Sequence, residues 1–277
     1  MSANQRVLVI GGTRGTGLLT AHSLQRHGVP VRVFARNPQS ARARLGPTFE
    51  LITGDITQPD TLPHALEGAT HVVFTAGCRS GRPTTERHIR ETEYGGVVNT
   101  LAAAQRVGFG GRFLYMTASG VTSRSWSAAI LNFYKGNTLV WRERAEHEIR
   151  ASGLEYTIVR AGILLNRTGG QRALLVTQRP LPLSIRYRIA RADVAEVFVA
   201  ALNHPRAGRA TFEVVWGDGP PRDSLPTLLD QLKPDAPADS LPRCDDVLEC
   251  DVGSGFLIIR RPSPVLALVG LAGHDPG

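Results

Sequence analysis

The segment from Val7 to Gly17 places the strongest constraint on how this chain folds. It reads Val-Leu-Val-Ile-Gly-Gly-Thr-Arg-Gly-Thr-Gly, so four apolar residues lead straight into glycines spaced G-x-x-x-G-x-G, and a helical pattern follows. Glycines at this spacing permit a tight turn, let the backbone approach phosphates closely and let the helix pack on the strand. Because the start of a helix attracts anions, this junction predicts the binding of a dinucleotide pyrophosphate.

Apolar runs and helical patterns alternate through the first 160 residues. The predicted strands are Val7–Ile10, Val31–Ala35, Glu50–Thr53, His71–Thr75, Arg112–Met116 and Tyr156–Arg160. The predicted helices are Gly15–His27, Thr61–Leu66, Thr85–Val107 and Ile130–Ala151. Strands that alternate with helices form right-handed crossovers and a parallel sheet with helices on both faces. We therefore expect an α/β fold with a Rossmann-type, doubly wound parallel sheet.

The pattern changes after Arg160. Residues 161–188 carry few periodic signals, and the elements predicted beyond them are a helix at Arg191–Leu202, a strand at Ala210–Val215, a mobile loop at Pro234–Pro242 and a strand at Phe256–Ile259. No repeat or clean linker interrupts the chain. We expect a single domain over residues 1–277, in which residues 1–160 form the cofactor-binding core and residues 161–277 form a small substrate-side elaboration and tail.

Chain length and hydropathy limit the classes of protein to which this chain can belong. A chain of 277 residues with 42% hydrophobic residues has enough apolar surface to bury a core. The longest apolar candidate for a membrane span, Val265–Gly273, is far too short. No basic and apolar signal region precedes Val7. We therefore expect a cytoplasmic protein that does not bind a membrane.

The charged residues and cysteines narrow the classes of partner. The net charge of +8 comes almost entirely from arginines scattered along the chain, with Lys135 and Lys233 as the only lysines. No basic run with interleaved aromatic residues occurs, so the charge favours small anionic ligands over nucleic acid. Cys78, Cys244 and Cys250 form no pair with metal-ligand spacing, so we expect free thiols and no metal site.

Two arginines indicate which dinucleotide binds. Folds specific for NAD usually carry an acid at the end of the second strand, where it binds the ribose hydroxyls. Here that position holds Arg36, and Arg14 lies inside the glycine turn. Two guanidinium groups that converge on a 2′-phosphate favour NADP(H), although both could instead be ordinary surface charges.

The chain resembles the atypical short-chain dehydrogenase/reductase family, in its NmrA-like and biliverdin/flavin-reductase-like NAD(P)H-binding branch. Seven segments in the same order carry the resemblance: Val7–Gly17, Ala35–Pro38, Thr53–Ile56, Val72–Gly77, Phe113–Val121, Ser152–Arg160 and Ile189–Ala195. They extend over roughly residues 6 to 216. The resemblance implies the same fold and a site at the carboxyl ends of the strands, where ligands bind in open α/β sheets.

The resemblance also assigns cofactor contacts to individual residues. The turn would hold the phosphates through Gly11, Gly12, Thr13, Arg14, Gly15, Thr16 and Gly17. Asp55 and Ile56 would flank the adenine, although Asp55 could simply form a turn. The next strand would supply Thr75, Ala76 and Gly77 along the ribose path, and the one after it would place Thr117 and Ser119 beside the nicotinamide.

One family feature is missing. Many relatives use a Tyr-x-x-x-Lys pair in which the lysine holds the ribose and lowers the pKa of the tyrosine that donates a proton. Counting back from Ser152, these positions fall on Thr138 and Arg142. Arg142 could still hold the ribose, but a permanent cation cannot transfer a proton.

Three other residues are candidates for the chemistry that the pair would perform. Tyr134 and Lys135 lie one helical turn earlier and could face the site from the loop that leads into the helix. Ser119 could polarise a substrate oxygen through a hydrogen bond. Glu146 is expected to be a solvated helix residue.

These observations leave three functions open. The first is an NADPH-dependent reductase of a small aromatic, quinone, flavin or conjugated carbonyl substrate, since a substrate that takes its proton from water needs no tyrosine. The second is an isomerase or cyclase that retains its cofactor. The third is an NADP(H)-binding redox sensor without catalysis. We expect a monomer, with a homodimer as the alternative.

Overall fold

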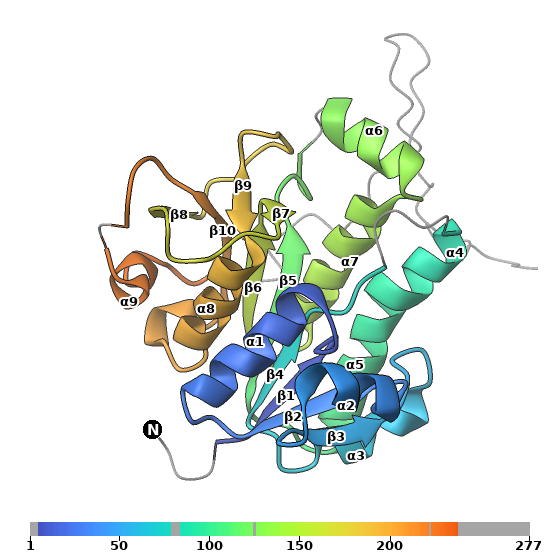
Figure 1. Ribbon diagram of the computed structural model, residues 1–277. Helices are drawn as coiled ribbons and strands as arrows, with labels where there is room; N and C mark the ends of the chain where they lie inside the picture. Colours follow the sequence, from blue (N-terminus) through green and yellow to red (C-terminus); the bar gives the residue numbers. More distant parts are fainter. Residues whose placement is uncertain (1–4, 79–83, 124–125, 222, 238–277) are drawn as a thin grey trace, which may run out of the picture. The chain divides into compact units, whose positions relative to one another are not determined.

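The computed structural model describes residues 5–78, 84–123, 126–221 and 223–237 (Figure 1). The chain divides into two units, Met1–Asp235 and Ala236–Gly277, and the fold below is that of the first. The predicted strand Phe256–Ile259, most of the predicted loop Pro234–Pro242, and Cys244 and Cys250 lie outside the described residues.

The first unit is built on an eight-stranded sheet of order β3-β2-β1-β4-β5-β6-β10-β8. The strands are β1 Val7–Ile10, β2 Val31–Ala35, β3 Glu50–Thr53, β4 His71–Phe74, β5 Arg112–Ala118, β6 Glu155–Ala161, β8 Leu174–Thr177 and β10 Ala210–Trp216. All pairs are parallel except the one that β8 makes with β10 at the edge. Because β1 is covered on both faces, all four of its residues are apolar and buried. The predicted Rossmann-type sheet is confirmed.

Helices cover both faces of the sheet, as Figure 1 shows. One face packs against α1 Gly15–Arg26, α2 Pro38–Leu45, α8 Arg191–Ala201 and α9 Leu225–Leu229. The other packs against α3 Leu62–Leu66, α5 Gly96–Arg106 and α7 Thr138–Ala151. Each face buries its own apolar cluster, so the polar connections collect at the two edges where the strands begin and end.

Two long predicted helices are interrupted. The predicted helix Thr85–Val107 consists of α4 Glu86–Ile89, a π-helical turn Arg90–Gly95, and α5. The predicted helix Ile130–Ala151 is two helices, α6 Trp126–Tyr134 and α7. Gly136 and Asn137 between them have φ values of 50° and 57°, and a left-handed backbone cannot continue an α-helix.

The half predicted to form the substrate side, which begins at residue 161, contains elements that periodicity did not predict. Residues 161–188 contain β8 and β7 Ile163–Leu165, and β7 pairs in parallel with β9 Arg188–Ala190 in a separate two-stranded sheet. Short 3₁₀ turns occur at Pro59–Thr61 and Pro205–Ala207. Since β8 and β10 extend the main sheet, the part of this half that carries them is continuous with the sheet of residues 1–160. Within the described ranges, no helix has the length and apolar character needed to cross a membrane.

Candidate cofactor site and active site

The glycine turn lies between β1 and α1 at the carboxyl edge of the sheet. Gly11 has a φ of 87°, and a Cβ added to it would lie 2.6 Å from the backbone nitrogen of Ala76. A Cβ on Gly17 would collide with the hydroxyl of Thr75 and the carbonyl oxygen of Gly11. Both positions therefore need glycine, because the turn packs directly on the residues that follow β4.

The start of α1 is open to an anion. Arg14 occupies the N-cap position without a side-chain cap, and the first turn contains no acidic residue. The hydroxyl of Thr16, in that same turn, is buried and has no hydrogen-bond partner among the described residues. Unpaired N–H groups at the positive end of a 12-residue helix, beside an unpaired hydroxyl, fit the phosphates of a dinucleotide.

Arg36 and Asp55 follow the neighbouring strands β2 and β3. Their side chains form a loose ion pair with 3.9 Å between Nη1 of Arg36 and Oδ2 of Asp55. The other carboxylate oxygen of Asp55 accepts hydrogen bonds from the backbone N–H and the hydroxyl of Thr57, both at 2.9 Å. Asp55 therefore makes a turn, as the alternative interpretation predicted, and also faces Arg36. The side chain of Arg36 is 69% exposed, so it can reach a ligand at this end of the sheet.

Arg14 reaches the other side of the turn. Its Nη2 donates to the carbonyl oxygen of Gly77 after β4, at 3.1 Å. In the sheet order, β4 and β2 lie on opposite sides of β1. The two arginines therefore contact different elements, and only Arg36 lies where the second and third strands end.

A buried ion pair occupies the position of the missing Tyr-x-x-x-Lys pair. Nε and Nη2 of Arg142 donate to the two carboxylate oxygens of Glu93 at 2.9 and 3.1 Å. Glu93 also accepts from the hydroxyl of Thr138 and, at 3.0 Å, from the backbone N–H of Cys78. Although burial raises the pKa of Glu93, the charge and bonds of Arg142 outweigh it and hold this pKa below its ordinary value. The carboxylate therefore stays charged.

Sequence reasoning did not single out Glu93. The π-helical turn orients it inward to 3% exposure, and a regular helix pattern gives no sign of such a turn. A Cβ on Gly77 would lie 2.9 Å from Nη2 of Arg142 and 3.3 Å from Oε1 of Glu93. The ion pair thus packs directly beneath the segment predicted to follow the cofactor ribose.

The end of β5 carries a second polar group. Thr117 and Ser119 are each 2% exposed, and the backbone N–H of Ser119 donates to the carbonyl oxygen of Ala161 at 2.8 Å. Beside Ser119 lies the carboxyl of Glu213 on β10, a residue that is also 2% exposed. Burial raises the pKa of Glu213 to about 7, against the opposing influence of the Ser119 hydroxyl and Arg160. The Nη1 of Arg160 is 3.7 Å from this carboxyl.

Glu146 is not the solvated helix residue that the sequence suggested. It is fully buried on α7, where its oxygens accept from Nε and Nη2 of Arg160 at 3.0 and 2.6 Å and from Arg150 at 2.9 Å. A buried carboxylate needs such partners, because an unpaired charge in the interior is very costly. Glu146 therefore neutralises Arg160 on β6 and shares Arg150 with Asp235.

Tyr134 and Lys135 lie at the end of α6. Tyr134 is 80% exposed and its ring contacts Phe133, while Lys135 begins the connection to α7. Their proposed roles in proton transfer stay predictions.

The comparisons with known proteins agree with this geometry. The profile of a family described as NAD(P)H-binding matches residues 11–205, from the glycine turn to the 3₁₀ turn that follows α8. The chain belongs to the NAD(P)H-binding family of atypical short-chain dehydrogenases/reductases. Sanguinarine reductase from Eschscholzia californica is 30% identical over 243 residues, which cover 75% of this chain and 88% of the relative.

Two solved structures are similar to this atypical dehydrogenase/reductase. A putative NAD-dependent epimerase/dehydratase from Bacillus halodurans has a TM-score of 0.69 and 26% identity, and the match covers 82% of this chain and all of the other. ChuY, an anaerobilin reductase from Escherichia coli O157:H7, has a TM-score of 0.59 and 22% identity over 79% of this chain and all of its own. The second likeness supports the fold alone.

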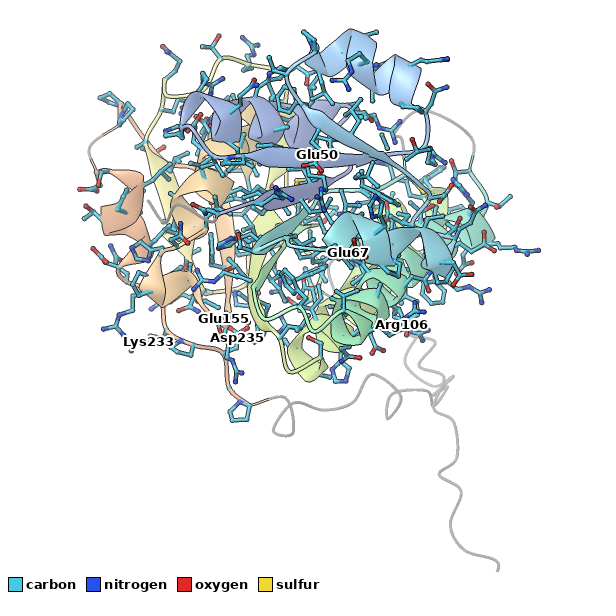
Figure 2. All side chains as sticks on the ribbon, turned by 90° about the horizontal axis from the view of Figure 1, so that it is seen from below. Glu50, Glu67, Arg106, Glu155, Lys233 and Asp235 are labelled. Carbon is cyan, nitrogen blue, oxygen red and sulfur yellow. The ribbon has the colours of Figure 1, made fainter. Side chains whose placement is uncertain are left out.

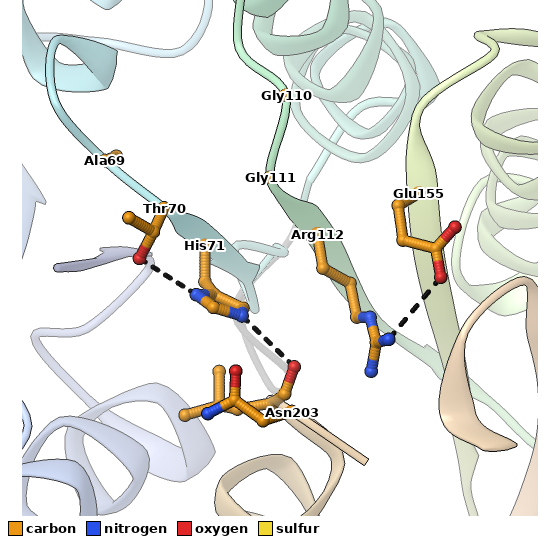
Figure 3. Close-up of a pocket in the computed structure, with 9 residues that line it drawn as sticks. Ala69, Thr70, His71, Gly110, Gly111, Arg112, Glu155 and Asn203 are labelled. Atoms are coloured by element: carbon orange, nitrogen blue, oxygen red, sulfur yellow. Dashed lines mark hydrogen bonds and ion pairs between the residues drawn. The ribbon is translucent and has the colours of Figure 1, made fainter. Parts of the chain in front are cut away.

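A cavity of about 520 Å³ in this atypical dehydrogenase/reductase lies at the opposite edge (Figure 3). His71, Arg112 and Glu155, which begin β4, β5 and β6, line it, and Figure 2 shows Glu155 on this face, seen from below. His71 bonds the carbonyl oxygen of Leu202, and Arg112 donates to the carbonyl oxygens of Ala201 and His204. These groups therefore fasten the end of α8 to the sheet and do not form the site.

The described part of the chain contains no group of three or more His, Cys, Asp or Glu side chains that could hold a metal ion. The arrangement can bind a dinucleotide along the carboxyl edge, with polar side chains at the end of β5. It offers a buried hydroxyl at Ser119 and a cation at Arg142 that Glu93 holds in place.

Proposed function

We propose that this protein is an NADPH-dependent reductase of a small aromatic, quinone, flavin or conjugated carbonyl substrate. The observation that carries this proposal is the Glu93–Arg142 ion pair at the position of the usual acid–base pair. Bound NADPH supplies a hydride, and Arg142 has no proton to give. A substrate whose reduced form takes its proton from water suits such a site. Sanguinarine reductase, the relative with 30% identity, supports the reaction class.

The preference for NADP(H) rests on Arg36. The residue that follows β2 is this arginine and not an acid. Its ion pair with Asp55 is long and exposed, so little free energy is lost when the Arg36 side chain turns from Asp55 to a 2′-phosphate. Arg14 contributes to the turn through its bond to Gly77 and is not needed for this preference.

Ser119 is the proposed polarising group for the substrate oxygen. Its buried hydroxyl follows β5 directly, whereas the hydroxyl of Tyr134 belongs to a largely exposed side chain. The Ser119 hydroxyl has no hydrogen-bond partner among the described residues. A hydrogen bond from it to the substrate oxygen would strengthen as negative charge develops and would accelerate the reaction. For Tyr134 to act as proton donor, the end of α6 must close on the substrate.

The test is NADPH consumption by the full-length protein against a panel of flavins, quinones and conjugated carbonyls. We expect turnover with at least one member of the panel. For that substrate, Ser119→Ala should lower kcat by roughly 100-fold, and Tyr134→Phe should leave it within about 2-fold. Unchanged NADPH affinity in Ser119→Ala is the control for an intact site. Equal loss in both variants would make Tyr134 a participant, and an unaffected Ser119→Ala would remove Ser119 from the mechanism.

A redox sensor is the second candidate. The observation that favours it is α6, which exposes Trp126, Ile130 and Phe133 at 78%, 55% and 84% on a helix above the site. Exposed apolar groups of this kind are common where proteins bind partners. Tight NADP(H) binding without consumption by any panel member would favour the sensor, or an isomerase or cyclase that retains its cofactor, over the reductase.

For partners we propose a small-molecule substrate and no nucleic acid or membrane, in a cytoplasmic monomer with a homodimer as the alternative. Light scattering of the full-length protein with and without NADPH measures the oligomeric state directly.

A further inference from the structure

Arg191 is the first residue of α8 and lies at the same edge as the glycine turn. Its Nη1 donates to the carbonyl oxygen of Leu164 at 3.1 Å and to Oδ1 of Asn166 at 2.8 Å. Both acceptors belong to the segment that follows the carboxyl end of β6. These two bonds fix the guanidinium group in one place, although the side chain is only half-buried.

The guanidinium group of Arg191 also lies over the glycine turn. Its Nε is 3.7 Å, and its Cδ 3.9 Å, from the position of a Cβ built on Gly15, the first residue of α1. Figure 1 shows α1 and α8 side by side on one face of the sheet. The start of α1 and the side chain of Arg191 therefore meet at one point.

The charge of Arg191 has no anionic partner within the described residues. None of their carboxylates is paired with it, whereas Arg36 has Asp55 and Arg142 has Glu93. The acid nearest to it in sequence, Asp193, accepts from the backbone N–H of Gly170 at 2.6 Å and from Nε1 of Trp216 at 2.7 Å. Asp193 is therefore committed elsewhere, and the guanidinium group of Arg191 lies beside the glycine turn without a carboxylate partner among the described residues.

We propose that Arg191 binds the pyrophosphate of the bound dinucleotide. A fixed, uncompensated guanidinium group beside uncapped N–H groups is suited to a phosphate oxygen, to which it donates charge-assisted hydrogen bonds. Arg191, Leu164 and Asn166 all follow residue 160. The half of the chain predicted to form the substrate side therefore contributes to cofactor binding through these three residues. This assignment needs only cofactor binding and does not depend on the proposed reductase activity.

The experiment measures the Kd values of NADPH, NADH and adenosine 2′-phosphate for the full-length protein and four variants. Arg191→Ala should weaken NADPH and NADH by a similar factor, about 10-fold or more, because both contain the pyrophosphate. Adenosine 2′-phosphate lacks the pyrophosphate, so its Kd should not change. Arg36→Ala should show the reverse pattern, with NADPH and adenosine 2′-phosphate weakened and NADH unaffected.

Two further variants control for damage to the fold. Arg188→Ala removes an exposed arginine three residues away, in β9, and should leave all three Kd values unchanged. Arg191→Gln removes the charge but keeps a side chain that can donate to Leu164. It replaces Arg191→Ala as the test variant if that variant does not fold, and it should also weaken the binding of both dinucleotides. Unchanged dinucleotide affinity in the folded Arg191 variants would overturn the proposal. An equal loss for adenosine 2′-phosphate would overturn it too, because the variant would then have disturbed the whole site.

Discussion

At the scale of single residues, the choice between the two dinucleotides depends on Arg36. Because its pair with Asp55 is long and its side chain mostly exposed, little stability is lost when it turns to a ligand. We expect Arg36→Ala to raise the Kd of NADPH by about 10- to 100-fold, the usual effect of losing hydrogen bonds to a charged group. NADH should bind as before. Similar losses for the two dinucleotides, measured by calorimetric titration, would argue against a 2′-phosphate contact.

A second prediction at this scale concerns the pH dependence of stability. Burial raises the pKa of Glu213 to about 7 in the folded protein, from an ordinary value of 4.5. The stability that its protonated form provides is therefore complete below pH 4.5 and is lost as the pH rises through 7. As the pH rises across this range, we expect the free energy of unfolding of Glu213→Gln to increase by roughly 3 kcal/mol relative to that of the wild type. Urea unfolding at several pH values measures this difference. If the free energies of unfolding of the two proteins changed in parallel with pH, the prediction would be wrong.

At the scale of elements, the π-helical turn Arg90–Gly95 holds Glu93 against α7. Removing one partner of a buried ion pair leaves the other charge uncompensated, at a cost of about 3–5 kcal/mol. We expect Glu93→Ala to lower the free energy of unfolding by this amount, as measured by denaturant titration. Glu91→Ala, which removes a carboxylate paired at the surface with Arg87, is the matched control and should leave the free energy of unfolding nearly unchanged. Equal effects would mean that the Glu93–Arg142 pair is not a structural anchor.

The same elements show where sequence reasoning reached its limit. The β1–α1 junction could be predicted because its strand, glycines and helix are contiguous in sequence. Glu93 could not, because its inward orientation depends on one extra residue in a helical turn and on a partner that lies 49 positions away. The break between α6 and α7 falls at Gly136 and Asn137, which both have a left-handed backbone. It was missed because a single glycine inside a helical pattern is often tolerated and does not by itself end a predicted helix.

At the scale of the whole molecule, the doubly wound sheet follows from the alternation of apolar runs with helical patterns, and the structure confirms it. The substrate-side half was predicted less well. The strands β7 and β9 have three residues each and β8 has four, too few to establish a period. Their positions depend on tertiary contacts such as the bonds from Arg191 to Leu164 and Asn166.

The central claim is that this site binds NADPH and passes its hydride to a substrate. The most direct measurement uses NADPH that carries deuterium at the transferable position, with mass spectrometry of the product from a substrate found in the panel. If the hydride is transferred to a carbon whose hydrogen does not exchange with water, we predict that each product molecule carries one deuterium at that carbon. Product without the label at a non-exchanging carbon, or NADPH bound tightly and never oxidised, would contradict the claim.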